Sequence, residues 1–294
     1  MGLARGQSVF PAWSNPLTWW WALLVIASGA NIAAWFVLFR YLQAPWKLQA
    51  PWNLQAPWSG GLGSASDVEL MLFLSAAYVC GCAFRSFLPR ADVQRICLFD
   101  TWLSSVTLGR SVATVAELCF AAQWAIILRQ LGTMTGTYTT LSAAWAIVPL
   151  ILIAECFSWH GVVTRNYLSN AIENTLWAVS FFIVGIGLGR LVPEFEGLGG
   201  VVLVVAIVGI AGYLLFLAAI DVPMYLTRWR NDRARVERLH PLEGLWDASV
   251  RWVVTHDLAK WKDEIAWMSL YFTVAVWSSL ALCVCYAYAG DLPR

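Results

Sequence analysis

The chain has 294 residues, of which 60% are hydrophobic and only 13% are charged, and its formal net charge is +1. Soluble domains carry about one quarter charged residues, so this composition predicts a protein that has lipid as its main solvent. A nearly neutral chain without a basic tail does not fit a nucleic-acid partner. We therefore expect an all-α, polytopic membrane protein whose first partner is membrane lipid.

Seven apolar runs predict seven membrane-spanning helices within a single integral membrane domain of residues 1–294, because a span needs about 20 mainly apolar residues. The 23-residue first run favours a retained helix over a cleaved signal peptide. The 19 tryptophans lie largely near run ends or in connectors, where the indole ring prefers the headgroup layer. The runs are residues 17–39, 67–84, 101–128, 140–161, 171–191, 199–220 and 265–289.

The basic residues predict how the spans are oriented. Seven spans place the amino terminus on the same side as the loops after spans two, four and six. That side carries thirteen of the 19 Lys and Arg residues, the other side carries five, and Arg110 lies within span three. The positive-inside rule therefore predicts a cytoplasmic amino terminus and an external carboxyl terminus. A bacterial inner membrane and an organelle membrane both fit this multi-pass topology.

Two connectors are long enough to have structure of their own. Residues 40–66 repeat the segment Leu-Gln-Ala-Pro-Trp three times, and a proline every sixth residue forbids a regular helix. This Trp/Pro repeat is either a neutral linker or an arm whose indoles meet the outer headgroups.

Residues 227–264 are basic, and from Pro241 to Trp261 apolar residues recur at helical spacing. This second pattern predicts one amphipathic interfacial helix on the cytoplasmic side, either an anchor or a lid.

Four ionisable residues interrupt the apolar runs: Arg110, Glu117, Glu155 and His160. A charge in hydrocarbon costs at least ~2.5 kcal/mol, so it persists where it is paired, hydrated or functional. Chain direction places Glu117 near the midplane and Arg110 ~7 Å to the cytoplasmic side of the centre of span three. Glu155 lies in the cytoplasmic half of span four, and His160 lies near the interface.

Span five begins with a polar stripe of Asn170, Glu173 and Asn174 on the same side of the membrane. Except for Glu117, the buried polar groups therefore collect in the cytoplasmic half of the bundle. This asymmetry predicts a polar cavity that is bordered by spans three, four and five and faces the cytoplasm.

Arg110 and Glu117 lie seven residues and ~10 Å apart along one helix face, which we interpret as too far for direct pairing. Arg110 is then expected to pair with Glu155 or Glu173. Such a pair either fixes helix packing or belongs to a functional site. Glu117 is expected to remain unpaired, with desolvation favouring its protonated form.

The histidines and cysteines argue against several cofactor-dependent classes. Zinc hydrolases and membrane cytochromes b need several histidines within the bundle, and only His160 lies near it. Retinal proteins need a lysine within the last span, and this chain has none after Lys262. The seven cysteines form no CxxC pair. No metal site is predicted, and the sequence identifies no cofactor.

The first functional hypothesis is a small proton-coupled or anion transporter, or a subunit of one. Arg110, Glu117, Glu155 and Asn174 would then bind the substrate or protons, as intramembrane charges do in transporters. The absence of a visible internal repeat weakens this hypothesis.

Two alternatives come from other classes. A membrane-embedded enzyme acting on a lipid or amphiphile would use Glu155, His160 and Glu173 as acid, base or metal ligands. A structural or assembly subunit, in a homo- or hetero-oligomer, would use every polar group for helix packing. The sequence motifs do not choose among these functions.

Overall fold

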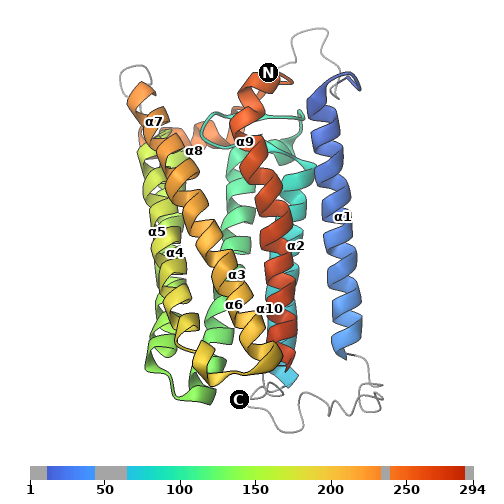
Figure 1. Ribbon diagram of the computed structural model, residues 1–294. Coiled ribbons are helices and arrows are strands. Elements are labelled where there is room, and N and C mark those ends of the chain that lie inside the picture. The colour runs from blue at the N-terminus through green and yellow to red at the C-terminus, as the bar shows by residue number, and fades with distance from the viewer. Residues whose placement is uncertain (1–11, 44–64, 233–238, 289–294) are drawn as a thin grey trace.

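The computed structural model describes residues 12–43, 65–232 and 239–288. Within these residues, seven helices are long and apolar enough to cross a membrane, as the sequence predicts. They form one bundle (Figure 1), so the chain is a multi-pass helical membrane protein. The Trp/Pro repeat, which the sequence places in residues 40–66, lies outside the described residues except at its ends. The candidate spans are Pro16–Gln43, Asp67–Phe87, Val106–Thr135, Tyr138–Thr164, Tyr167–Glu194, Gly197–Asp232 and Leu258–Tyr288.

Five of the spans are built on one α-helix each, the fifth with a 3₁₀ turn at Val192–Glu194 after it, and two contain a π-helical turn. The single helices are α1 (Pro16–Gln43), α2 (Ala65–Phe87), α3 (Val106–Thr135), α4 (Tyr138–Thr164) and α5 (Tyr167–Gly189). The sixth span joins α6 (Gly197–Phe216) to α7 (Val222–Asp232) through a π turn at Leu217–Asp221. The seventh joins α9 (Leu258–Leu270) to α10 (Val276–Tyr288) through a π turn at Tyr271–Ala275. Such turns occur frequently at functional sites.

Local side-chain chemistry sets the ends of the helices around the polar cluster. Ser105 caps α3 by accepting a hydrogen bond from the N–H of Leu108, so α3 starts later than the predicted residue 101. Residues 102–104 form a short 3₁₀ turn instead. Gly136, with φ of 70°, ends α3 in the left-handed region that favours glycine. Asn166 caps α5 by accepting from the N–H of Leu168.

A small sheet covers the end of the bundle at which α1, α3 and α5 begin, which we call the amino-terminal face. Strand β1 (Arg90–Ala91) pairs antiparallel with β2 (Ile96–Cys97), and β2 pairs in parallel with β3 (Val253–Val254). The sheet therefore joins the loop after α2 to the segment before α9. α10 ends at the opposite, carboxyl-terminal face (Figure 1).

Buried arginines fix this sheet to the bundle. Arg90 is fully buried and donates to the carbonyl of Ser105 at 2.9 Å, and its guanidinium occupies the space beside Gly109 where another residue would have a Cβ. Burial lowers the pKa of Arg90 to about 10, whereas the neighbouring Asp92 raises it. Arg95 pairs with Asp247 at 3.1 Å. Burial also lowers the pKa of Arg95, and the hydrogen bond to Asp247 opposes that effect.

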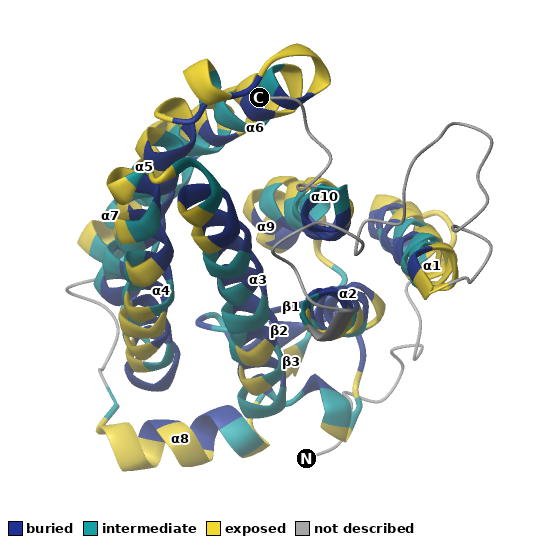
Figure 2. Cartoon of the chain, turned by 90° about the horizontal axis from the view of Figure 1, so that it is seen from below, coloured by how far each residue is buried: buried dark blue, intermediate teal, exposed yellow. Residues whose placement is uncertain are grey.

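The amphipathic segment after Pro241 is not one helix. α8 (Pro241–Val250) ends before β3, and α9 then forms the first turns of the seventh span. The pairing of residues 253–254 with β2 interrupts the helix, and Asp257 caps α9 by accepting from the N–H of Ala259. α8 runs across the ends of α3 and α4 (Figure 2).

α8 keeps the amphipathic pattern that the sequence shows, with its apolar side chains facing outward. Leu242 and Trp246 are 75% and 71% exposed, whereas Gly244 and Ala248 are buried. Outward-facing apolar residues suit contact with lipid, although a position in the membrane interface stays a prediction.

A second polar network shows that buried polarity is not confined to the half nearer the amino-terminal face. Gln123 of α3 is fully buried, and its amide donates to the carbonyls of Met71 and Ser279 at 3.2 and 3.3 Å. Ser279 donates to Oε1 of Gln123 at 2.6 Å. This neutral network joins α2, α3 and α10, so the predicted asymmetry holds for the charges and not for every polar group.

Replacing Gly244 with alanine is expected to loosen α8, because a Cβ there would lie 1.9 Å from the carbonyl oxygen of Val163. Overpacking of this kind typically costs about 1–3 kcal/mol. Thermal unfolding in detergent should show a lowered Tm for Gly244→Ala. Gly29→Ala in α1 is the matched control, because nothing lies within 4 Å of its added Cβ. Equal Tm values for both variants would contradict this packing.

Candidate functional site

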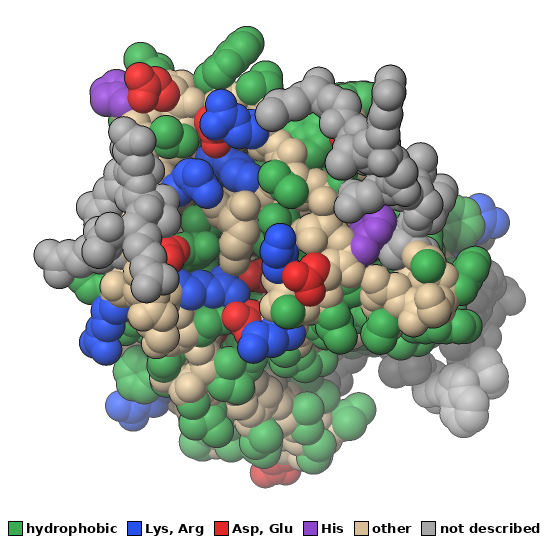
Figure 3. Space-filling view, turned by 90° about the horizontal axis from the view of Figure 1, so that it is seen from above, with side chains coloured by type: hydrophobic (Ala, Val, Ile, Leu, Met, Phe, Trp, Pro, Cys, Tyr) green, Lys and Arg blue, Asp and Glu red, His purple; other side chains and the backbone are tan. Residues whose placement is uncertain are grey.

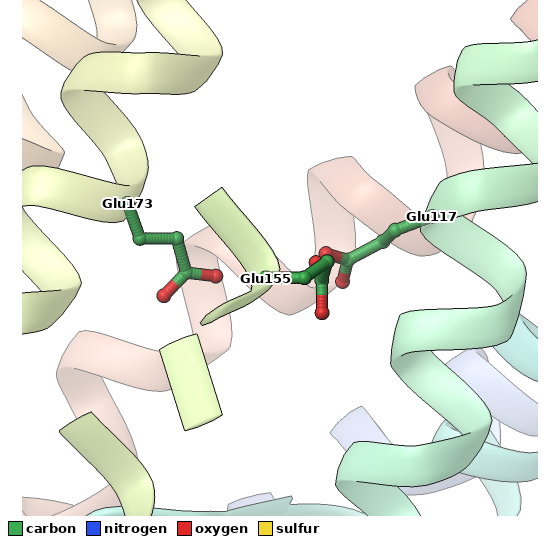
Figure 4. A group of neighbouring side chains, drawn as sticks. All are labelled: Glu117, Glu155 and Glu173. Atoms are coloured by element: carbon green, nitrogen blue, oxygen red, sulfur yellow. The ribbon is translucent and has the colours of Figure 1, made fainter. Parts of the chain in front are cut away.

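Arg110 of α3 is the centre of a buried cluster of charged side chains. Its Nη2 lies 3.0 Å from Oε2 of Glu117 and 2.7 Å from Oε2 of Glu155, and its Nη1 lies 3.8 Å from Oε1 of Glu173. These four residues are only 2% to 9% exposed. The carboxyl groups point toward one another from α3, α4 and α5 (Figure 4), so three helices meet at one guanidinium.

The prediction that Glu117 is unpaired is wrong. Its spacing of seven residues from Arg110 places both side chains on one helix face, and the two long side chains extend toward each other until they meet at 3.0 Å. The expected pair of Arg110 with Glu155 is present, and Glu173 adds a longer contact. The prediction considered only the axial distance between the two backbone positions, and it neglected how far Arg and Glu side chains extend along the helix.

Uncharged neighbours orient the carboxylates. Thr114 donates to Oε2 of Glu155 at 2.5 Å, and the indole of Trp159 donates to the Thr114 hydroxyl at 3.0 Å. Asn170 donates to Oε2 of Glu173 at 3.1 Å. Thr114 and Trp159 are cluster residues that were not predicted from the sequence. Helical spacing could have identified them, because Thr114 follows Arg110 by four residues and Trp159 follows Glu155 by four.

The cluster has more acidic than basic groups. If all three carboxylates were ionised, the single guanidinium would leave two negative charges uncompensated. Within the described residues, no second Lys or Arg forms an ion pair with these carboxylates. Buried charge without a partner is strongly unfavourable, so the cluster must take up protons or a cation to approach neutrality.

The carboxylates are close enough together to share one cation. Each offers an oxygen, and these oxygens lie within 4.8 Å of one another. An all-oxygen set suits a hard cation such as Mg²⁺ or Ca²⁺. Arg110 already donates to two of the three groups, however, so a metal ion would compete with the guanidinium, whereas a proton would not.

A cavity of about 680 Å³ lies beside the cluster. Arg110, Glu117 and Glu173 line it, but Glu155 does not, and α4 contributes only Val162. The remaining walls come from α2, the loop after α2, α6, α7, α9 and α10 and both π turns. Spans three and five therefore border the cavity as predicted, whereas span four reaches it only at Val162, and Glu155 pairs with Arg110 without lining the cavity.

A polar junction borders the cavity toward the amino-terminal face. Glu264 of α9 accepts hydrogen bonds from Gln94 at 2.9 Å, from Arg228 of α7 at 3.0 Å and from the Trp267 indole at 2.7 Å. It thereby joins the loop after α2 to the sixth and seventh spans. Figure 3 shows Lys, Arg, Asp and Glu side chains gathered on this face of the molecule.

Two other predicted site residues lie outside the cluster. His160 is exposed, its Nδ1 lies 2.7 Å from the hydroxyl of Ser169, and it does not line the cavity. Asn174 does line the cavity, and its amide donates to Asp221 at 2.5 Å. The structure therefore brings Glu155 and Glu173 to Arg110, but it does not bring His160 to the cavity beside them.

The fold and the site together fit a multi-pass helical membrane protein with a charged cluster beside a cavity in the helical bundle. The chain matches no protein-family model, and no curated protein or solved structure is significantly similar to it. The function is therefore inferred from the geometry and charge of this site.

Arg110 and Glu117 are expected to respond in opposite ways to neutralisation. Arg110→Met leaves three buried carboxylates without a cation and should lower the free energy of unfolding by about 3–5 kcal/mol. Glu117→Gln removes one excess negative charge and keeps a hydrogen-bonding group, so stability at neutral pH should stay equal or rise. Thermal unfolding in detergent would compare the two. A larger loss for Glu117→Gln than for Arg110→Met would contradict the charge balance described above.

Proposed function

We propose that this protein is a proton-coupled transporter in which the carboxylates around Arg110 bind and release protons. The observation that carries the proposal is the ratio of three buried carboxylates to one guanidinium, next to a cavity large enough for a small molecule. A group that must gain or lose protons as its surroundings change can couple proton movement to substrate binding. The charge asymmetry of the loops supports a cytoplasmic amino-terminal face.

Transport of an anion through Arg110 has less support. The guanidinium already contacts Glu117, Glu155 and Glu173, so an anionic substrate would have to displace a carboxylate. It would also meet two uncompensated negative charges whenever the acids are ionised. The cluster therefore favours protons and cations over anions.

The enzyme and structural-subunit hypotheses explain fewer of the observations. An acid–base site could use Glu117 and Glu173, which line the cavity, but the predicted His160 is exposed, bonded to Ser169 and not among the lining residues. A purely structural ion pair needs one carboxylate for its arginine, and it needs no cavity. Three carboxylates beside a cavity fit proton exchange better.

Proton binding by the cluster is directly measurable. At neutral pH, infrared spectra of the protein in lipid should show the carbonyl stretch of a protonated carboxylic acid, because charge balance requires bound protons or a cation. Glu117→Gln should reduce this band, and the exposed Glu194→Gln should leave it unchanged. A spectrum without the band in metal-free buffer, or one insensitive to Glu117→Gln, Glu155→Gln and Glu173→Gln alike, would refute proton binding here.

Coupled transport is tested in liposomes loaded with a pH-sensitive dye. Small-molecule fractions prepared from the source cells are added outside, and the internal pH is followed. We expect at least one fraction to change the internal pH with the wild type and with Glu194→Gln. The same fraction should have no effect with Glu117→Gln or with empty liposomes. If no fraction acts, or if Glu117→Gln behaves as the wild type does, proton coupling through this cluster is excluded.

A further inference from the structure

Aromatic rings line the part of the cavity beyond the charged cluster. Phe181 of α5 lies at the centre of this group, with its ring centroid 5.3 Å from that of Tyr213, 5.8 Å from Trp124, 5.9 Å from Trp177 and 6.3 Å from Phe120. All five residues line the cavity. We call this group the aromatic cage. Aromatic faces of this kind attract cations, including quaternary ammonium groups, through their quadrupoles.

The acids and the aromatic cage share helix faces. On α3, Phe120 and Trp124 follow Glu117 by three and seven residues, and on α5, Trp177 and Phe181 follow Glu173 by four and eight. These are the spacings that align side chains along one face of a helix. A molecule in the cavity therefore meets the carboxylates and the aromatic rings together.

A further wall of the cavity, formed by the sixth and seventh spans, reaches the outer surface of the bundle between α6 and α10. Val205 of α6 and Val274 of the second π turn both line the cavity, and they are 65% and 61% exposed. α6 packs chiefly against α5, and no extensive contact joins it to α10 (Figure 2). At this depth the exposed surface of the spans faces hydrocarbon. An apolar molecule dissolved in the membrane can therefore reach this side of the cavity.

We propose that the cavity binds lipophilic organic cations, which reach it from the membrane between α6 and α10. The excess of carboxylates selects positive charge, the aromatic cage accommodates a bulky apolar cation, and the apolar border allows lateral entry. The N–H of the buried Trp124 has no acceptor within the described residues, so it also offers a hydrogen bond to a polar atom of the bound molecule. This inference rests on the proposed function, because it names the substrate class of the same site.

Two ions of nearly equal shape and opposite charge test this proposal. Tetraphenylphosphonium is a lipophilic cation, and tetraphenylborate is its anionic counterpart. Binding of each to the protein in lipid nanodiscs is measured by calorimetry, and the signal of empty nanodiscs is subtracted to remove partitioning into lipid. We expect the cation to bind at least tenfold more tightly than the anion, because the charge of the site, and not the apolar surface of the ion, decides affinity.

Variants separate the three parts of the proposal. Glu117→Gln and Glu173→Gln should each weaken binding of the cation about tenfold, and Trp124→Leu should weaken it about fivefold, on the scale of one cation–π contact. Gly209 is exposed and lines the cavity four residues after Val205, so Gly209→Leu adds a bulky side chain beside the proposed entrance, and nothing lies within 4 Å of an added Cβ there. This variant should slow association severalfold. Glu194→Gln and Gly29→Leu, both away from the cavity, are the controls.

Equal binding of both ions, or no binding of either, overturns the proposal. Unchanged affinity in Glu117→Gln, Glu173→Gln and Trp124→Leu, with each variant monodisperse and folded, overturns it as well. Different results would refute the proposed function and the proposed ligand class. Phosphonium binding without any proton flux in liposomes would support the ligand class and refute coupling, whereas proton flux with another substrate and no phosphonium binding would do the reverse.

Discussion

One guanidinium that pairs with three carboxylates inside the helical bundle is the constraint on which the rest of the structure depends. Arg110 draws Glu117, Glu155 and Glu173 to a single point, so α3, α4 and α5 must pack closely there. Burial makes this arrangement strict, because a buried charge without a partner is strongly unfavourable. The seventh span and α6 are not tied to the guanidinium, and the cavity lies on their side of the cluster.

Hydropathy predicted all seven spans, because length and apolar composition alone decide whether a helix can cross a membrane. Direction along the spans also brought Arg110 and Glu155 to a common depth. Side-chain reach was harder to predict, and Glu117 was left unpaired because axial distance between backbone positions is a poor measure of contact between long side chains. The break between α8 and α9 could not be predicted from a helical pattern, because it depends on pairing of β3 with a strand 157 residues earlier.

The basic residues that predict topology also build the amino-terminal face. Arg85 and Arg90 both pair with Asp92, and Arg95 reaches Asp247 and the carbonyl of Val162. A count of arginines treats these residues as solvated, yet all three are buried. Their side chains fix the loop above the cavity, so residues that the positive-inside rule counts only as charges also have a structural role. The polar junction at Glu264 continues this network to α7 and α9, so the face is cross-linked by ion pairs from several elements.

The acid-to-base ratio of the cluster has an electrical consequence. If two protons leave while one monovalent cation enters, the site becomes one unit more negative and the exchange moves net charge across the membrane. Each elementary charge moved through the full membrane potential changes the free energy by about 2.3 kcal/mol per 100 mV. A one-for-one exchange would instead be insensitive to voltage. In the proposed transporter, three glutamates on a single arginine would thus allow the membrane potential to act alongside the pH gradient.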